Sequence, residues 1–155
     1  MNSEKNKNNI EVNIALVRSG AKIPLYATEG SAACDLSACI DAPFVLNVGQ
    51  IAPIPTGIAL SAERSDVVAL VFARSGLGTK YGVGLANGVG VIDSDYRGEL
   101  HVSLINRGSA PFTVNPGDRI AQLMFAPVYV ASFTEVTSLD ETERGTGGFG
   151  STGIK

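Results

Sequence analysis

The stretch ELHVSLINR, residues 99–107, decides the fold class of this chain. Its apolar residues Leu100, Val102 and Leu104 alternate with other side chains and therefore share one face of an extended backbone. Alternation with a period of two predicts a strand that buries one face in a core and leaves the other face outside.

Similar short runs rich in Val, Ile and Leu recur along the chain, separated by Gly, Pro, Asn or Asp. They are VNIALV, FVLNV, IAPIPTGIAL, VVALVFA, GVGVI and RIAQLMFAPVYV. Prolines that disfavour helices stand at Pro53, Pro55, Pro111, Pro116 and Pro127. No long stretch keeps a helical period, and SGLGTK (residues 75–80) is the best candidate for a short helix. We therefore expect an all-β sandwich or jelly roll.

The composition limits the number of domains and the kinds of partner. A chain of 155 residues, 45% of them hydrophobic, has the length of one globular domain with one core. Its net charge of -3 provides no basic field for DNA or RNA, so we expect no nucleic-acid partner. A small phosphorylated ligand is not excluded, because it needs only a few local arginines.

The cysteines and the hydropathy pattern bear on location. Cys34 and Cys39 are the only cysteines, too few for a disulfide framework or a zinc site, and they fit a reducing compartment. No apolar run reaches the roughly 18 residues that span a bilayer. The opening MNSEKNKNNI has no apolar stretch of the kind found in signal peptides. We expect a cytoplasmic protein with no membrane partner.

The two ends of the chain differ in composition from its middle. Residues 1–9 are polar and rich in Asn and Lys, and residues 140–155 combine acidic residues with glycines. Such compositions favour mobile segments in the free protein. We expect a disordered extension over residues 1–9, one folded domain over residues 10–139 and a flexible arm over residues 140–155.

The arm contains a glycine pattern that is typical of phosphate-binding loops. In RGTGGFGSTGIK, residues 144–155, the spacing of Gly148, Gly150 and Gly153 fits G-x-G-x-x-G. Such a loop normally lies between a strand and a helix, and no room for a helix remains before Lys155. The Walker pattern fails as well, because Ile154 stands where it requires Lys. The usual interpretation of these glycines is therefore excluded.

The candidate catalytic groups are carboxylates. His101 is the only histidine and alternates with apolar neighbours in a strand, which favours a structural or surface role and leaves serine-triad and thiol-protease schemes without a base. In GVGVIDSDYRGEL, residues 88–100, Asp93 directly follows an apolar strand. It is compatible with a solvated hairpin turn and also with a general base held at the end of a buried strand.

Three further signals leave alternatives open. In ARSGLGTK, residues 73–80, Arg74, Ser75 and Gly76 fit an ordinary strand exit as well as a phosphate site. Asp35 in GSAACDLSA and Gln122 in RIAQLMF are compatible with packing and turn formation alone.

Taken together and in order, five segments resemble the five motifs of the homotrimeric deoxyuridine triphosphate nucleotidohydrolases, the dUTPases. They are ATEGSAACDLSA, ARSGLGTK, GVGVIDSDYRGEL, GDRIAQLMF and RGTGGFGSTG, and the resemblance runs from about Pro24 to Gly153. It implies a jelly-roll subunit that assembles as a homotrimer, with active sites at the interfaces built from all three chains. It also implies a role for the glycines, because the family's fifth motif is an arm that crosses to a neighbour and closes over the nucleotide.

The resemblance implies hydrolysis of dUTP to dUMP and pyrophosphate, which limits uracil incorporation into DNA and supplies dUMP for thymidylate synthesis. Asp93 matches the general base that activates the water attacking the α-phosphorus. Mg²⁺ would bind the triphosphate oxygens, since one protein carboxylate cannot both hold the ion and activate water. Asp35 would reach that ion through water.

The same resemblance assigns the groups that bind phosphate. Arg74, Ser75 and Gly76 would hold the α- and β-phosphates, and Gln122 from a neighbouring subunit would add a further hydrogen bond.

The nucleoside would be bound by the third motif. Tyr96 would pack under the deoxyribose and exclude the 2'-hydroxyl of UTP. Asn87 and the backbone of LANGVGVI would read uracil edge-on in a pocket too tight for thymine.

In the arm, Phe149 would stack on the base and Gly150 would let the backbone approach the phosphates. Arg144, Ser151 and Thr152 would supply hydrogen-bond donors to the terminal phosphates.

The sequence departs from the family pattern at two places, and two functions other than dUTP hydrolysis are considered as alternatives. Ala73 stands before Arg74 where many relatives have Pro, and YGVGLANGVG is unusually rich in glycine around the base hairpin. The alternatives are a deoxycytidine triphosphate deaminase, a sibling on a similar fold, and a nucleotide-binding regulator without catalysis. Retention of both Asp93 and Phe149 favours the hydrolase.

Overall fold

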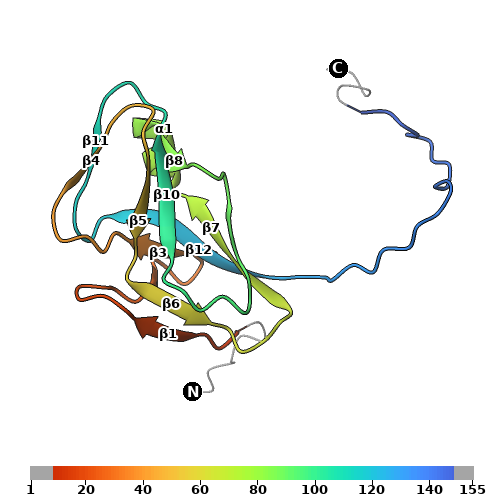
Figure 1. The fold of residues 1–155 in the computed structure, drawn as a ribbon, viewed down its shortest axis with the longest axis horizontal. Coiled ribbons are helices and arrows are strands. Elements are labelled where there is room, and N and C mark those ends of the chain that lie inside the picture. Colours follow the sequence, from red (N-terminus) through yellow and green to blue (C-terminus); the bar gives the residue numbers. More distant parts are fainter. Residues whose placement is uncertain (1–8, 149–155) are drawn as a thin grey trace.

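The computed structural model describes residues 9–148, which form twelve short strands and one helix (Figure 1). In chain order the elements are β1 (Asn13–Leu16), β2 (Leu25–Tyr26), β3 (Cys34–Ser37), β4 (Phe44–Leu46), β5 (Ile51–Pro55), β6 (Ile58–Ser61), β7 (Val67–Ala73), α1 (Ser75–Tyr81), β8 (Val83–Leu85), β9 (Gly90–Ile92), β10 (His101–Asn106), β11 (Phe112–Val114) and β12 (Arg119–Pro127). The predicted all-β chain with one short helix in SGLGTK is confirmed.

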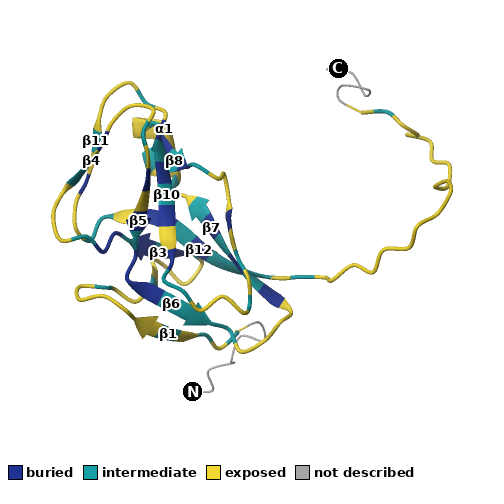
Figure 2. Ribbon diagram, in the orientation of Figure 1, coloured by how far each residue is buried: buried dark blue, intermediate teal, exposed yellow. Residues whose placement is uncertain are grey.

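Two sheets make up most of the sandwich. A five-stranded sheet has the order β2-β3-β12-β7-β9, and a three-stranded sheet has the order β5-β10-β8. The pairs β1-β6 and β11-β4 complete the body, and the pairings among the described strands are antiparallel. Buried side chains of both larger sheets belong to one hydrophobic cluster, so the sheets pack face to face around a single core (Figure 2).

Strand β10 shows how the sequence produces this packing. Val102 and Leu104 are buried whereas His101 is exposed, as the alternation in ELHVSLINR predicts. The strand lies between β5 and β8, so its backbone is hydrogen-bonded on both sides. It therefore forms the centre of its sheet.

The helix ends at a glycine that the backbone requires. Gly82 has a φ of 70°, in the left-handed region, and its N–H donates to the carbonyl of Gly78 at 3.0 Å. A Cβ on Gly82 would lie 2.5 Å from the backbone of Gly108. The helix therefore ends at Tyr81, and β8 begins directly after Gly82.

Asn106, at the end of β10, is a fully buried polar residue whose side chain joins three segments. Its Nδ2 donates to the carbonyls of Leu46 and Ala110, each at 2.9 Å, and its Oδ1 accepts from the N–H of Gly108 at 2.9 Å. A buried amide with its hydrogen bonds satisfied fixes the geometry of the turn after β10.

Beyond β12 the chain leaves the sandwich and runs away from it (Figure 1). Val128 still donates its N–H to the carbonyl of Asp66 at 3.0 Å, but the side chains of Tyr129 and Phe133 are 99% and 94% exposed. Large apolar groups of this kind are normally covered in a stable assembly.

The single helix among residues 9–148 is too short and too polar to cross a membrane. The predicted disordered extension lies almost entirely in residues 1–8, outside the described residues.

Replacing Asn106 by Asp should destabilise the fold by about 3 to 5 kcal/mol, because a buried carboxylate cannot donate to two carbonyls. Asn47→Asp is the control, since Asn47 is exposed and should change stability by no more than about 0.5 kcal/mol. Urea unfolding at one protein concentration measures both. Equal midpoints for the two variants would contradict the role given to Asn106.

Candidate active site

Two guanidinium groups flank one carboxylate on the five-stranded sheet. Arg74 Nε lies 3.1 Å from Asp35 Oδ1, and Arg119 Nη1 lies 2.9 Å from Asp35 Oδ2. Arg74 Nη1 also donates to the carbonyl of Arg119 at 3.1 Å. The Asp35 side chain is only 12% exposed, whereas that of Arg119 is 56% exposed. We call these three residues the arginine cluster; it carries a net positive charge that faces solvent.

The pairing of β3 with β12 places Gln122 beside this cluster. Asp35 lies directly opposite Gln122, and residues opposite each other in an antiparallel pair point to the same face. Cys34, Leu36 and Leu123 are buried, so the alternation turns Asp35 and Gln122 away from the core. The structure thus brings together two predicted site residues, Asp35 and Gln122, next to Arg74.

A β-bulge explains how Arg119 reaches the same face. Ala121 pairs with Leu36, but Arg119 pairs with Ser37, so β12 has one extra residue between them. Strict alternation would put Arg119 on the same side as buried Ala121, and the bulge instead directs it toward Asp35. Sequence reasoning missed Arg119, because the segment GDRIAQLMF gives no sign of the bulge.

The turn from β7 into α1 carries the other predicted phosphate ligands. Arg74 is extended, with φ -80° and ψ 128°, and its carbonyl accepts from the N–H groups of Leu77 and Gly78. The first N–H groups of a helix, here those of Ser75 and Gly76, have no intrahelical partner. A Cβ on Gly76 would meet nothing within 4 Å, so the fold of one chain does not itself require glycine there.

The predicted nucleoside ligands and the predicted base lie on the connection from β8 to β9 and on the loop after it. This connection is not the hairpin expected from the sequence, because β8 and β9 belong to different sheets. Asn87 is exposed in the turn, before Gly88 with its φ of 73°. Strand β9 pairs with β7 and ends the order of its sheet, so its other side presents free backbone donors and acceptors. Asp93 follows β9 directly and is exposed.

Residues 93–99, which we call the Asp93 loop, hold a tyrosine in a defined position. The N–H of Tyr96 donates to the carbonyl of Asp93 at 3.1 Å, and its hydroxyl donates to the carbonyl of Glu99 at 3.1 Å. A Cβ on Gly98 would lie 2.6 Å from Cζ of Tyr96. The ring therefore packs directly on the glycine backbone.

A pocket of about 220 Å³ joins these groups. Its lining includes Asp93, Tyr96, Glu99 and His101, together with β9 residues. The exposed carboxylate and the tyrosine ring thus face one concave space, in which a ligand can contact both.

Glu99 lines this pocket with a carboxylate that is only 15% exposed. Arg18 Nε donates to its Oε1 at 2.6 Å, and the N–H of Gly57 donates to the same oxygen at 2.9 Å. The hydrogen bond from Arg18 holds the pKa of Glu99 below its usual value, so the carboxylate is ionised at neutral pH. Neither residue was singled out from the sequence, because their contact joins positions far apart in the chain.

The arginine cluster and Asp93 are too far apart in one chain to act on the same phosphate. Ile92 pairs with Ala69, and Arg74 lies five residues beyond Ala69 in extended chain. That spacing corresponds to about 17 Å along the strand. Asp93 continues past Ile92 in the opposite direction, which increases the separation.

The residues described do not form a metal site of their own. Residues 9–148 contain no group of three His, Cys, Asp or Glu side chains arranged to hold an ion. Both oxygens of Asp35 already bond to arginines. The donor set fits a cation that enters with a phosphate ligand, and it does not fit a cation held by the protein alone.

Of the predicted arm residues, Arg144 is described and is exposed, with its Nε donating to the carbonyl of Gly147 at 3.0 Å. Phe149, Gly150, Ser151 and Thr152 lie outside the described residues.

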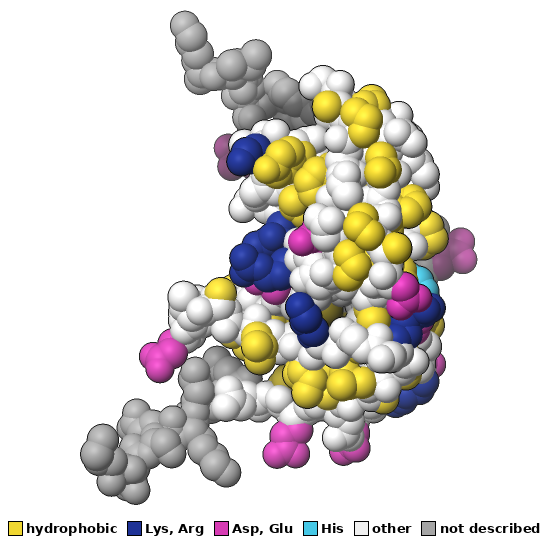
Figure 3. Space-filling model, turned by 90° about the vertical axis from the view of Figure 1, so that its left-hand side faces the viewer, with side chains coloured by type: hydrophobic (Ala, Val, Ile, Leu, Met, Phe, Trp, Pro, Cys, Tyr) yellow, Lys and Arg dark blue, Asp and Glu magenta, His cyan; other side chains and the backbone are white. Residues whose placement is uncertain are grey.

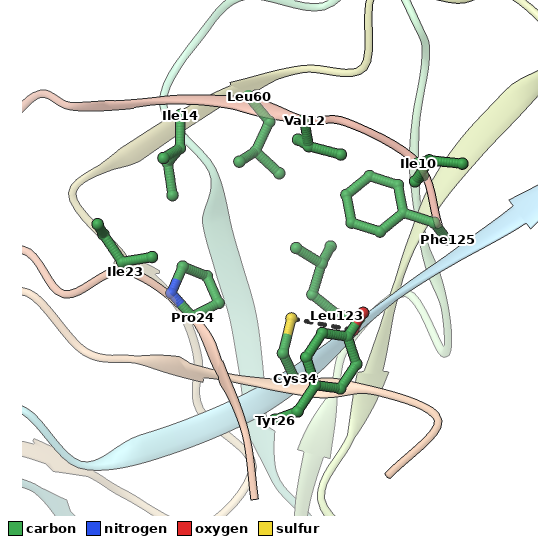
Figure 4. A pocket seen from close by; sticks show the side chains of 10 residues that line it. All are labelled: Ile10, Val12, Ile14, Ile23, Pro24, Tyr26, Cys34, Leu60, Leu123 and Phe125. Carbon is green, nitrogen blue, oxygen red and sulfur yellow. Dashed lines mark hydrogen bonds between the residues drawn. The ribbon is translucent and has the colours of Figure 1, made fainter. Parts of the chain in front are cut away.

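A second pocket, of about 240 Å³, lies beside β1 (Figure 4). It is lined almost entirely by apolar side chains, among them Ile10, Ile14, Tyr26, Leu123 and Phe125. Cys34 also lines it and donates to the carbonyl of Leu123, and burial raises the pKa of this thiol. An apolar lining of this kind suits contact with another apolar segment rather than with phosphates.

The charged side chains on the face shown in Figure 3 lie in separate groups among hydrophobic ones. No continuous basic surface is visible on this face.

Comparison with known proteins identifies the fold and the family. Among solved structures, a mutant dUTPase of Staphylococcus bacteriophage 80alpha with dUpNHpp has a TM-score of 0.84 at 23% identity, over 93% of this chain and 99% of that chain. A mutant dUTPase from phage phi11 of S. aureus, described with a structural Mg(II) ion, has a TM-score of 0.75 at 22% identity, over 84% and 99% of the two chains. The chain is a jelly-roll β-sandwich protein, as predicted.

The sequence comparisons are more specific. The dUTPase family model matches residues 19–153. The deoxyuridine 5'-triphosphate nucleotidohydrolase of Desulfitobacterium hafniense is 56% identical over 149 residues, 95% of this chain and 99% of that protein. The protein of the same name from Tolumonas auensis is 53% identical over 146 residues, 93% and 97% of the two chains. The chain belongs to the dUTPase family.

Proposed function

We propose that the protein is a dUTP diphosphatase, which hydrolyses dUTP to dUMP and pyrophosphate. The observation that carries this proposal is the pocket in which the exposed carboxylate of Asp93 and the fixed ring of Tyr96 meet at the end of an edge strand. The names of the relatives from D. hafniense and T. auensis support the same reaction.

Asp93 is the proposed general base. It orients a water molecule and accepts its proton, and the water oxygen attacks the α-phosphorus in line. A new P–O bond forms while the bond from the α-phosphorus to the oxygen bridging to the β-phosphate breaks, and pyrophosphate leaves. Exposure of Asp93 at a pocket wall is consistent with a base that must contact both water and substrate.

The arginine cluster is the proposed site of the α- and β-phosphates. Arg74 has remaining donors beyond those used on Asp35, and Ser75 and Gly76 offer backbone N–H groups. Gln122 adds an amide donor on the same face. We add Arg119 to the set, because it is exposed and is oriented by the same carboxylate.

The nucleoside is proposed to bind at β9 and the Asp93 loop. Uracil offers a donor between two acceptors along one edge, and the free backbone edge of β9 with Asn87 can pair with such an edge. Tyr96 packs on Gly98 and is held by the carbonyl of Glu99, so the ring cannot easily move away from a 2'-hydroxyl. This arrangement supports selection of dUTP over UTP.

Mg²⁺ is proposed to enter with the nucleotide, bound to triphosphate oxygens, where it would neutralise charge on the phosphates. Asp35 would contact that ion through water, as the family pattern implies. Because both of its oxygens already pair with Arg74 and Arg119, Asp35 would not bind the ion directly.

A homotrimer with shared sites is the proposed assembly. The distance between Asp93 and the arginine cluster of one chain supports it, because a complete site then needs the cluster of a neighbouring copy. The apolar pocket beside β1 and the exposed Tyr129 and Phe133 of the C-terminal segment support contact between copies.

The arm, over residues 140–155, is proposed to close over the nucleotide bound at a neighbouring copy, after a folded domain over residues 10–139. Arg144, Ser151 and Thr152 would bind the terminal phosphates, Phe149 would stack on uracil and Gly150 would allow close backbone approach. Closure would exclude water other than the nucleophile.

A cytoplasmic location without nucleic-acid or membrane partners is part of the proposal. The two cysteines are free thiols in the structure, which supports a reducing compartment.

Purified protein with Mg²⁺ should release pyrophosphate from dUTP. It should not release pyrophosphate at a comparable rate from dTTP, dCTP or UTP. Pyrophosphate and ammonia are followed together for each nucleotide. Ammonia from dCTP would instead identify the deaminase sibling, and no product from any of the four would favour a binding regulator.

Gly76→Ala should lower activity at the proposed phosphate site without lowering the stability of the fold. The fold has space for the methyl group, and Ala favours a helix by up to about 1 kcal/mol, so stability should be unchanged or raised. A methyl group at the phosphate position should lower kcat/KM for dUTP by about tenfold or more. Gly78→Ala in the same helix is the control and should keep full activity. Unchanged kcat/KM in Gly76→Ala would remove this turn from the phosphate site.

A further inference from the structure

Glu99 connects the Asp93 loop to two segments from the N-terminal half of the chain. Its carboxylate accepts hydrogen bonds from Arg18 Nε at 2.6 Å and from the N–H of Gly57 at 2.9 Å, and His101 Nε2 lies 3.6 Å away. The next residue, Leu100, donates its N–H to the carbonyl of Ile58 at 2.8 Å. The end of the loop is thus fixed to the strand β6 and to the segment before it.

The backbone of Glu99 transmits this anchoring to the tyrosine. The carbonyl that accepts the hydroxyl proton of Tyr96, at 3.1 Å, belongs to Glu99 itself. Within the loop, the other hydrogen bonds of Tyr96 involve only its backbone: its N–H donates to the carbonyl of Asp93, and its carbonyl accepts from Arg97 Nη1 at 3.0 Å. The position of the ring therefore depends on where Glu99 is held.

We propose that the ion pair of Arg18 and Glu99 positions the Tyr96 ring and thereby sets the preference for deoxyribose over ribose. Both are positioning residues, because they act through the loop and not on the reacting atoms. The inference rests on the proposed function, in which Tyr96 packs under the sugar.

The burial of Glu99 makes Arg18 necessary. A carboxylate that is 15% exposed needs partners for its charge, and loss of Arg18 would leave it with one backbone N–H and the His101 ring. The loop can then relieve the unpaired charge by turning Glu99 toward solvent. That movement displaces the carbonyl to which Tyr96 is bonded, and the ring no longer excludes the 2'-hydroxyl firmly.

The test compares kcat/KM for dUTP and for UTP in Arg18→Ala, Glu99→Gln and Arg18→Lys. Arg18→Ala and Glu99→Gln should each lower the dUTP to UTP ratio by about tenfold, which corresponds to about 1.4 kcal/mol. Arg18→Lys keeps the positive charge and should therefore lower the dUTP to UTP ratio less than Arg18→Ala does. The double variant should lose little more than either single variant, because both remove one interaction.

Arg64→Ala is the matched control, since Arg64 and Asp66 form an ion pair in which both side chains are about half exposed. It should leave the ratio unchanged. Thermal unfolding of every variant shows whether the fold is kept, and Glu99→Gln, which preserves shape, serves if Arg18→Ala does not fold.

Two outcomes would overturn the inference in distinguishable ways. An unchanged ratio in folded Arg18→Ala or Glu99→Gln would show that the pair only stabilises the loop. Failure of the unmodified protein to prefer dUTP over UTP would overturn the proposed function itself, and the inference with it.

Discussion

The carboxylate of Asp35 orients two guanidinium groups, and much of the proposed site depends on this interaction. Asp35 is largely buried, so its charge requires the hydrogen bonds from Arg74 and Arg119. In return the carboxylate fixes two long side chains whose free donors face solvent. A phosphate group bound there, as proposed, would meet arginines that are already ordered, and less conformational entropy would be lost on binding.

The five-stranded sheet makes this interaction possible. Strands β3, β12 and β7 lie side by side in the sheet, although they are far apart in the sequence. Their register places Asp35, Gln122 and the end of β7 at one level. The same sheet ends at β9, whose free edge leads to Asp93, so one sheet carries the proposed phosphate ligands and the proposed base at separate places. That separation supports the proposal of a site shared between copies.

Period-two alternation and turn residues predicted the class of fold well, because both depend on neighbours in the chain. The strand ELHVSLINR and the short helix at SGLGTK are confirmed. Arg119 could not be found in this way, since a bulge reverses its orientation. The pairs Arg18 with Glu99 and Asn106 with Leu46 join distant positions, and no local pattern indicates them. The roles of the predicted site residues came from the resemblance to the family, and they stay predictions.

We propose above all that one active site combines the base of one chain with the arm of another. The most direct test mixes Asp93→Asn chains with chains that end after residue 139, each inactive alone. Mixed assemblies should recover dUTP hydrolysis, because some of their sites then contain an intact Asp93 and an intact arm. No recovered activity, in mixtures shown to contain both chains in one assembly, would contradict it.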